Sequence, residues 1–461
     1  MPVNEEAPLS FSVDTLFFDT VFTTKGSATR LFKIYNESSE DLETNLVYER
    51  PGFFRFNVDG RPTDGNTSVK VPSKDSIYIF AEVTIDPDNP LSVSPFVIEE
   101  QIQFRTLNAL QEVNLVAWGQ NANYITNENR KGNISLLSCN FQEIALDDPK
   151  PYVVYGILVV DSCTLRLPAG CQLYVHGGVV NNNLGTYNDG LIFFGVDGTL
   201  ISEGTAEDPV IIQGDRLESI FDEVPGQWSG LRFGAASGPH QVKHTIVKNA
   251  INGMVLDSAS ELVLQQSQIV NNAGTGIVAR HARLNASNSL VVNGGLHPVQ
   301  LTFGGEYSFT YCTLVNYGLV SESLYANNIT CYNQDCSENA TNPLSLTVQN
   351  SIIMGSTADQ IGLLDATEQP GDFNLSLSHN LVRVEDLLDN YPDFFSICDP
   401  CWNYDFRQSM FQNPSEQDFM LDSLSQAAGK ALYLSSFPLD ASAKMRSTTE
   451  PDLGCFERLE P

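Results

Sequence analysis

The sequence has little positive charge, no long apolar run and no basic leader. Its 461 residues include 25 Lys and Arg against 56 Asp and Glu, which gives a formal net charge of −31. Such an acidic chain repels nucleic acid and anionic membrane surfaces, so we expect neither as a partner. No stretch approaches the roughly 18 apolar residues that a membrane-spanning helix needs. The opening residues 1–6 lack the basic start and apolar core of a signal peptide, and we expect them to form a short tether.

Familiar catalytic and cofactor-binding motifs are also missing. The chain contains no HExxH pair, no phosphate-binding loop and no Ser-His-Asp order. Gly274-x-Gly276 lacks the third glycine of a dinucleotide fingerprint, so we interpret it as a tight turn. We therefore predict no catalytic residues and no organic cofactor.

The nine cysteines leave at least one thiol without a partner in the chain. Cys331 and Cys336 form one close pair, and Cys398 and Cys401 form another. A zinc site at the second pair would need two more ligands, and no second CxxC or His lies nearby. We prefer packed or locally bridged thiols as the interpretation of both pairs.

Residues 8–122 alternate short strand-like runs with turn signals. The runs 31–35 and 76–83 are examples. Apolar and polar residues alternating between turns, roughly every 8–15 residues, are typical of an antiparallel sandwich of immunoglobulin-like type. We predict such a domain over residues 1–122, tether included, with an Asn-rich linker over 119–132.

An internal repeat replaces this alternation from about residue 150. Four segments share an aliphatic pair followed by polar or aromatic residues, and their starts lie 23, 21 and 24 residues apart. The segments are 245–249, 268–272, 289–293 and 313–317. Leucine-rich repeats have a similar period, but their L-x-x-L-x-L-x-x-N spacing does not fit these residues.

A period near 22 residues predicts a right-handed parallel β-helix, in which each coil supplies three short strands and three turns. Coils would stack about 4.8 Å apart, the spacing of paired strands, with an aliphatic side chain of each strand facing inward. Asn249, Asn272 and Asn293 follow the aliphatic pairs, so we expect them to stack as an amide ladder.

The fold class we predict is therefore all-β, an immunoglobulin-like sandwich followed by a right-handed parallel β-helix over 133–461. The open ends of a stack expose strand edges, so we expect both ends to be capped. The sandwich or residues 133–150 would cover one end. An irregular tail from about Asp399 would cover the other.

Six short segments occur in a distinctive order: FDTVFTT at 18–24, GSATR at 26–30, AWGQ at 117–120, GTAEDP at 204–209, VPGQWSG at 224–230 and PDLGCFE at 451–457. With these segments, nearly the whole chain resembles surface lipoproteins of Bacteroidota-type bacteria that join a small sandwich to a right-handed parallel β-helix. The resemblance implies export and display at the outer membrane, with membrane contact only through a lipidated Cys upstream. It implies no known reaction, and this sequence contains no lipobox.

One stretch of the chain is locally basic. Eight of the Lys, Arg and His residues fall between Arg232 and Arg283, more than twice the number that even spacing would place there, against only Asp257 and Glu261. One interpretation is a site for an anionic glycan or another acidic surface, and the other is a set of turn charges that balance local acids. The candidate ligand-binding residues are Arg232, Lys243, His244, Lys248, Arg280, His281 and Arg283.

Acidic residues gather over 214–226, just before Trp228, and we expect this stretch to form a loop. Carboxylates beside an aromatic residue could bind Ca²⁺ or cleave a glycosidic bond. The alternative is a solvated loop that leaves the stack, with Trp228 closing the core. Asp215, Asp222 and Glu223 are the candidate metal ligands, and Ca²⁺ is the metal that we consider for this loop.

Aromatic residues cluster near the later coils, at Tyr307, Phe309, Tyr311 and Tyr317. Rings on outward positions could hold sugars, whereas inward packing is more common. The sequence does not assign their faces.

We therefore expect a cell-surface binding or structural protein that presents a β-helix face to a polysaccharide or to an envelope protein. The alternative is a polysaccharide lyase or glycoside hydrolase acting on a cell-surface or dietary polysaccharide.

Overall fold

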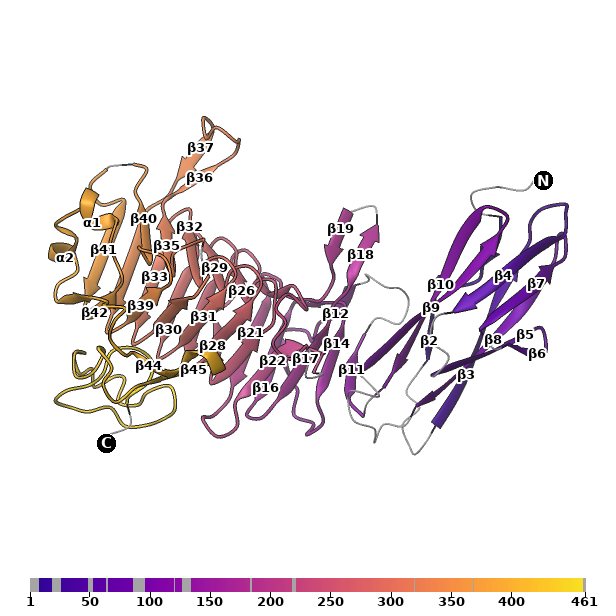
Figure 1. Ribbon diagram of the computed structural model, residues 1–461, viewed down its shortest axis with the longest axis horizontal. Helices are drawn as coiled ribbons and strands as arrows, with labels where there is room; N and C mark the ends of the chain where they lie inside the picture. Colours follow the sequence, from indigo (N-terminus) through magenta and orange to yellow (C-terminus); the bar gives the residue numbers. More distant parts are fainter. Residues whose placement is uncertain are drawn as a thin grey trace. The chain divides into compact units, whose positions relative to one another are not determined.

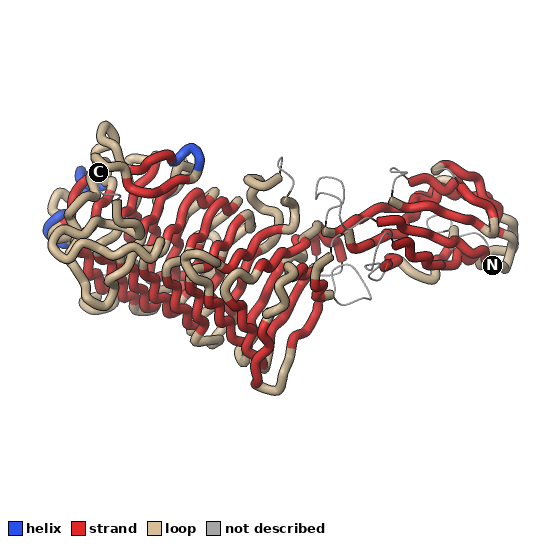
Figure 2. The backbone as a smooth tube through the Cα atoms, turned by 90° about the horizontal axis from the view of Figure 1, so that it is seen from below, coloured by secondary structure: helices blue, strands red, loops and turns tan. Residues whose placement is uncertain are grey.

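The computed structural model divides into two compact units, one formed by residues 1–133 with 215–222 and the other by 134–214 with 223–461. It describes residues 8–18, 26–48, 53–63, 65–85, 96–119, 121–126, 134–182, 185–217, 221–318, 320–367 and 369–458. The predicted tether, most of the FDTVFTT segment and much of the predicted linker lie outside these residues. Figures 1 and 2 show that nearly all regular structure is strand.

The first unit holds two five-stranded sheets that share one apolar core. All described pairings within them are antiparallel except that of β2 with β10. Sheet A contains β1 (Ser10–Phe11), β3 (Gly26–Tyr35), β8 (Ser76–Ile85), β5 (Phe54–Val58) and β6 (Arg61–Thr63). Sheet B contains β2 (Thr15–Phe18), β10 (Ala109–Trp118), β9 (Val97–Thr106), β4 (Leu42–Tyr48) and β7 (Asn66–Val71). A short strand, β11 (Asn123–Ile125), follows.

Alternation of side chains explains why these residues form strands. Along β4 the pattern is buried, exposed, buried from Leu42 to Tyr48, and β8 alternates in the same way. Apolar side chains on one face of each strand therefore reach the shared core, while polar ones face solvent.

The second unit is built from three long parallel sheets. Sheet C includes β14 (Tyr152–Tyr155), β17 (Gln172–His176), β22 (Val210–Gly214), β25 (Thr245–Lys248), β28 (Gln268–Asn272), β31 (Leu290–Gly294), β34 (Thr313–Asn316), β39 (Ile352–Gly355), β42 (Asn380–Val382) and β43 (Cys401–Asn403). Sheet D contains β12 (Ile134–Leu137), β15 (Ile157–Val160), β20 (Leu191–Phe194), β23 (Gly230–Phe233), β26 (Met254–Leu256), β29 (Ile277–Arg280), β32 (Val299–Thr302), β35 (Leu324–Asn327) and β40 (Ile361–Leu364). Sheet E contains β13 (Gln142–Ala145), β16 (Cys163–Pro168), β21 (Gly198–Glu203), β24 (His240–Lys243), β27 (Glu261–Gln265), β30 (Arg283–Ser287), β33 (Gly305–Thr310), β38 (Leu344–Gln349) and β41 (Phe373–Ser378).

The chain visits sheets D, E and C in turn, and we call each such circuit a coil. Each strand pairs in parallel with the strand one coil away, as Leu264 does with Ala286 and Val270 with Val292. This arrangement, consistent with a parallel β-helix, confirms the prediction of an all-β chain with long parallel sheets.

Ladders of polar side chains reinforce the corner between sheets E and C. The backbone N–H of Thr245 donates to Ser267 Oγ at 3.1 Å, and that of Ser267 donates to Ser289 Oγ at 3.2 Å. All three residues are buried. Because buried backbone donors must find acceptors, this ladder satisfies N–H groups that the sheets leave unpaired.

Glycine forms a column at the opposite corner, between sheets C and D. A Cβ on Gly253 would lie 2.5 Å from Ile269 Cγ2, and one on Gly276 would lie 2.7 Å from Val291 Cγ1. The absence of a side chain therefore lets the corner approach the core closely. Gly274-x-Gly276 belongs to this corner, as a turn between β28 and β29.

The C-terminal tail lies against the outer face of sheet C (Figure 1). Val292, Val315 and Met354 form one cluster with the tail residues Phe419 and Leu453. Two short helices, α1 (Leu387–Asn390) and α2 (Phe394–Ile397), precede the tail, and α2 contacts the last strand of sheet E. Within the described residues, no helix is long and apolar enough to span a membrane.

Three further pairs of strands and turns complete the fold. Two hairpins leave the coils: β18 (Val179–Asn182) with β19 (Gly185–Asn188), and β36 (Ile329–Cys331) with β37 (Asn339–Thr341). The tail itself contains β44 (Phe411–Asn413), the 3-10 turn η1 (Pro414–Glu416) and β45 (Asp418–Leu421).

Cysteines are bridged locally, as the sequence predicted for two pairs. Disulfides join Cys331 to Cys336 and Cys398 to Cys401. A third disulfide, between Cys139 and Cys163, links neighbouring coils and was not predicted. The remaining thiols, Cys171, Cys312 and Cys455, are buried.

Candidate functional site

The seven predicted ligand-binding residues are distributed over all three parallel sheets. Arg232 and Arg280 lie on sheet D, Lys243 and Arg283 on sheet E, and Lys248 on sheet C. His244 and His281 lie in the turns that follow β24 and β29. The structure therefore brings these residues to several faces and does not join them into one patch.

Most of these cations already contact acceptors on neighbouring coils. Arg232 donates to both carboxylate oxygens of Asp257, at 2.8 and 3.1 Å, and Arg280 donates to Thr330 Oγ1 at 2.8 Å. Lys248 Nζ lies 3.9 Å from a carboxylate oxygen of Glu223. An acidic ligand would have to compete with these partners. Binding of an anionic glycan by these residues stays a prediction.

Sheet E carries two charge ladders of the same form. Arg166 pairs with Glu143 and Glu203, one on each neighbouring strand. Arg283 pairs in the same way with Glu261 and Glu306. The Arg166 guanidinium lowers the pKa of Glu143. A carboxylate held in its charged form is poorly suited to act as a general acid.

Lys243 differs from the other cations because it is exposed on β24 and makes no ion pair among the described residues. It is in register with Glu203 of the first ladder. Its charge also lowers the pKa of His244, although burial of that imidazole is the larger cause.

His240 is a core residue, although it lies in the basic stretch. Its ring packs against Phe194 and Phe233, Nδ1 accepts from the Leu200 backbone N–H at 3.0 Å, and Nε2 lies 2.9 Å from Ser237 Oγ. Burial lowers the pKa of His240 to about 4. The imidazole is therefore neutral at pH 7 and has no free nitrogen for a ligand.

The described residues of the acidic loop are not arranged as a metal centre. Asp215 is buried, and Trp228 is fully buried with Nε1 donating to the Lys248 backbone carbonyl at 3.0 Å. Glu223 contacts Lys248 and Gln417. No group of three or more His, Cys, Asp or Glu suited to a metal occurs among the described residues, which exclude 218–220 of this loop. Calcium binding by Asp215, Asp222 and Glu223 stays a prediction.

The aromatic cluster of the later coils mostly faces inward. Tyr307, Phe309 and Tyr311 are at most 3% exposed, whereas Tyr317 is 37% exposed and stacks near Phe419 of the tail. The first three rings are therefore core residues and cannot contact a glycan.

Sheet E presents a polar outer face over its last four strands. In-register pairing places Asn285, Ser308, Thr347 and Ser376 in one column. These side chains are exposed or half-buried. Amide and hydroxyl groups thus repeat at the spacing of paired strands, about 4.8 Å, which gives a ligand several hydrogen-bonding partners in a row.

Sheet D presents a second outer face, which carries an aromatic residue that the sequence analysis missed. Tyr325 points outward from β35, where Leu324 and Ala326 face the core. The alternation Leu-Tyr-Ala was the signal that could have placed its ring on the surface. His297 and Glu322, from the turns that precede β32 and β35, lie beside it.

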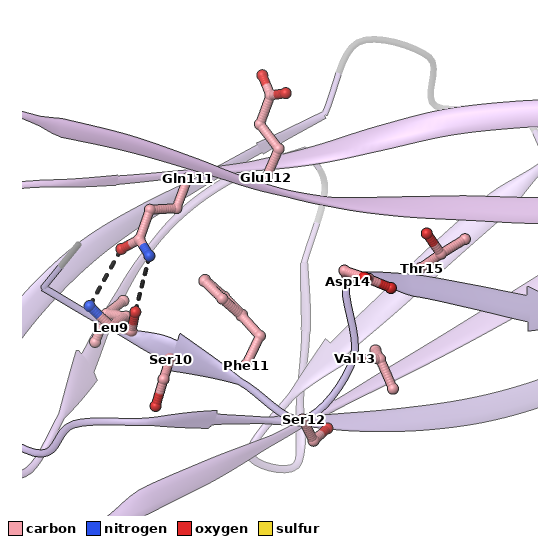
Figure 3. Close-up of a pocket in the computed structure, with 9 residues that line it drawn as sticks. All are labelled: Leu9, Ser10, Phe11, Ser12, Val13, Asp14, Thr15, Gln111 and Glu112. Atoms are coloured by element: carbon pink, nitrogen blue, oxygen red, sulfur yellow. Dashed lines mark hydrogen bonds between the residues drawn. The ribbon is translucent and has the colours of Figure 1, made fainter. Parts of the chain in front are cut away.

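The first unit contains a shallow hollow of about 470 Å³ between the strand ends of β1, β2 and β10 (Figure 3). The Gln111 side chain crosses it and pairs with the backbone of Leu9, accepting from N–H at 3.1 Å and donating to the carbonyl at 2.8 Å. This amide ties the residue before β1 of sheet A to β10 of sheet B. The hollow therefore has a structural explanation.

No protein-family model matches the chain, and no curated protein matches it. Among solved structures, it is similar to the catalytic unit of a thermostable GH87 α-1,3-glucanase from Streptomyces thermodiastaticus, with a TM-score of 0.29, 10% identity and 81% of each chain covered. It is also similar to a PapD-like domain of human CEP192, with a TM-score of 0.20 and 10% identity over 26% of this chain and 92% of that one. The CooA pilin subunit of enterotoxigenic Escherichia coli gives a TM-score of 0.18 and 8% identity over 25% of this chain and all of that one.

Proposed function

We propose that this protein is an exported binding protein of the cell surface that holds a glycan along the outer faces of its parallel sheets. In this proposal the stacked coils form a right-handed parallel β-helix, and the first unit is an immunoglobulin-like sandwich. The alternative partner is an envelope protein.

The observation that carries the proposal is the polar outer face of sheet E. Its amide and hydroxyl side chains lie one per strand, in register, across β30, β33, β38 and β41. A polysaccharide offers hydroxyl groups along an extended chain, so a repeating row of donors and acceptors is suited to bind several sugar units. The tail covers the outer face of sheet C over β28, β31, β34, β39 and β42, which leaves the outer faces of sheets D and E to serve this role along these coils.

The chemistry of the sheet E face favours binding over turnover. Carboxylates that could act on a glycosidic bond, such as Glu143 and Glu306, are paired with arginines. The buried His240, with a pKa of about 4, is no base near pH 7. A lyase or hydrolase stays the alternative, and the release of new chain ends from a polysaccharide would reveal it.

Export is supported by the three disulfides, because such bonds persist in oxidising compartments. Display at the outer membrane through an upstream lipidated Cys rests on the resemblance of the sequence. Quantifying free thiols in protein recovered from the cell envelope tests the first part. We expect three buried thiols that react only after unfolding, and nine reactive thiols would contradict export.

The test of function is a screen of the purified protein against immobilised neutral and acidic polysaccharides. Retention on the polymer and the release of new reducing or unsaturated ends are measured on the same samples. We expect retention without product. New chain ends would establish the enzyme alternative, and failure to bind any polysaccharide would overturn glycan binding in favour of a protein partner.

A further inference from the structure

The aromatic ring of Tyr325 lies over a position on sheet D that lacks a side chain. Strand pairing places Tyr325 between Gln300 on β32 and Gly362 on β40. A Cβ added to Gly362 would lie 2.9 Å from Tyr325 Cδ2 and 3.3 Å from the carboxylate carbon of Glu322. Any larger residue would displace both groups, so Gly362 lets the ring and the carboxylate lie close to the sheet.

His297 fixes the two groups relative to one another. Its ring lies 5.4 Å from that of Tyr325, with 25° between the planes. His297 Nδ1 lies 3.0 Å from the backbone carbonyl of Glu322 and 3.6 Å from its carboxylate. Asn327 Nδ2 also donates to the Tyr325 hydroxyl at 3.4 Å. The ring is therefore held by neighbours on three strands or turns, while remaining half-buried on the outer face.

These groups have the chemistry of a sugar subsite. The C–H-rich face of a pyranose ring packs against an aromatic ring, which removes apolar surface from water without ordering a flexible side chain. The Glu322 carboxylate, whose side chain is 36% exposed, can accept hydrogen bonds from sugar hydroxyl groups. Gln300 is outward and half-buried on the neighbouring strand and offers both a donor and an acceptor.

Charge decides which sugars fit this subsite. Glu322 places a carboxylate beside the ring, and the chain has a formal charge of −31. A uronate or sulfated sugar would meet like charge there, which costs binding energy. A neutral hexose meets no such repulsion.

We propose that Tyr325, Glu322 and Gln300 form a subsite on the outer face of sheet D for a neutral hexopyranose unit of a polysaccharide. This inference rests on the proposed function, since it names where and which kind of glycan the protein binds. Tyr325 supplies the stacking surface, Glu322 and Gln300 bond the hydroxyl groups, and His297 positions Glu322.

The test compares Tyr325→Ala with Tyr332→Ala in the full chain. Tyr332 is a matched control because it is 65% exposed on the neighbouring hairpin, where its ring has no role in the subsite. Affinity electrophoresis in gels containing a neutral glucan, a neutral mannan or polygalacturonate gives a dissociation constant for each. We expect Tyr325→Ala to weaken binding to a neutral polymer about tenfold and Tyr332→Ala to leave it unchanged, at equal thermal unfolding midpoints.

Glu322→Gln separates the charge from the hydrogen bonds. The amide keeps polar atoms at this position, so binding of the neutral polymer should fall by less than in Tyr325→Ala. Equal affinity of Tyr325→Ala and wild type, or equal losses in the two tyrosine variants, would overturn the subsite while leaving the proposed function intact. Wild-type binding to polygalacturonate alone would overturn the choice of a neutral sugar. Wild-type protein that binds no polysaccharide would overturn the proposed function itself.

Discussion

The side-chain amide of Asn271 donates a hydrogen bond to the side-chain carbonyl of Asn249, 2.7 Å away on the preceding coil. The register of β25 and β28 pairs Lys248 with Val270, which stacks the two asparagines directly. The sequence predicted Asn272 in this ladder, and that prediction was wrong. Asn272 is 1% exposed and its amide atoms have no partner among the described residues.

Substitutions of Asn271 test this bond and the backbone beneath it. Asn271 has φ of +54°, a left-handed conformation that Asn and Gly adopt more easily than Ala. We expect Asn271→Gly to destabilise the second unit by about 1 kcal/mol through the lost bonds to Asn249 and the Glu223 carbonyl. Asn271→Ala should cost about 1 kcal/mol more. Denaturant unfolding in which Ala and Gly were equally stable would argue against the left-handed turn.

Arg446 connects the tail to the coils through a buried network. It is 2% exposed and donates to Asn288 Oδ1 at 2.9 Å and to Glu457 Oε2 at 3.2 Å, while its guanidinium lies 3.9 Å from the Tyr311 ring. Asn288 and Tyr311 occupy the same turn position of successive coils. Two turns of sheet E thus hold one tail side chain.

Arg446→Met should therefore release the tail. Removing one partner of a buried ion pair costs roughly 3–5 kcal/mol, because the other charge stays buried. We expect a lower unfolding midpoint and faster proteolysis within 405–458, and partial restoration by the additional change Glu457→Gln. Arg407→Met, at an exposed position of the same segment, is the control and should change neither quantity. A tail that stayed protected in Arg446→Met would refute the anchoring role.

His240 makes stability depend on pH. Its folded pKa of about 4 lies below the ordinary value of 6.5, so protons bind the unfolded chain more tightly. Above pH 6.5 the neutral imidazole makes its full contribution to the free energy of unfolding. This contribution falls as the pH drops from about 6.5 towards 4. The loss is about 2 kcal/mol at pH 5.

The measurement compares wild type with His240→Gln at about pH 7.5 and pH 5. Other groups titrate in both proteins, so the difference between the two unfolding free energies isolates His240. We expect wild type to lose about 2 kcal/mol relative to the variant on acidification. A difference that does not change with pH would show that His240 is not buried as a neutral ring.

The sequence predicted the stacked parallel strands because aliphatic residues recur once per coil, and that period is a property of the sheet itself. It placed the tail over the open end of the stack, whereas the structure packs the tail against the outer face of sheet C. The signal was nevertheless present in sheet C, where Val291-Val292 and Leu314-Val315 are consecutive apolar pairs. A strand with apolar residues on both faces is covered on both faces, and here the tail supplies the outer cover.

The candidate site was harder to predict because sequence neighbours separate at each turn. Arg280 and Arg283 are three residues apart, yet they lie on sheets D and E and contact different partners. Conversely, one face brings together residues that are far apart in the sequence. Tyr325 lies 28 residues after His297 and 37 residues before Gly362, yet it contacts both. Insertions such as the β36–β37 hairpin interrupt the period between them, so counting 22 residues does not find such contacts.

Both proposed binding faces depend on the register of the coils, because the register determines which residues are neighbours on adjacent strands. Engineered cysteines at Asn285 and Ser308 test it most directly, since these outward residues are paired on β30 and β33. Neighbouring Cα atoms about 4.8 Å apart satisfy disulfide geometry, whereas Asn285 and Thr347, two strands apart, lie about 10 Å from each other. Peptide mass analysis after mild oxidation should find the Asn285→Cys/Ser308→Cys bridge in high yield and none for Asn285→Cys/Thr347→Cys. A bridge in the second pair without one in the first would contradict the stacked arrangement and both proposals built on it.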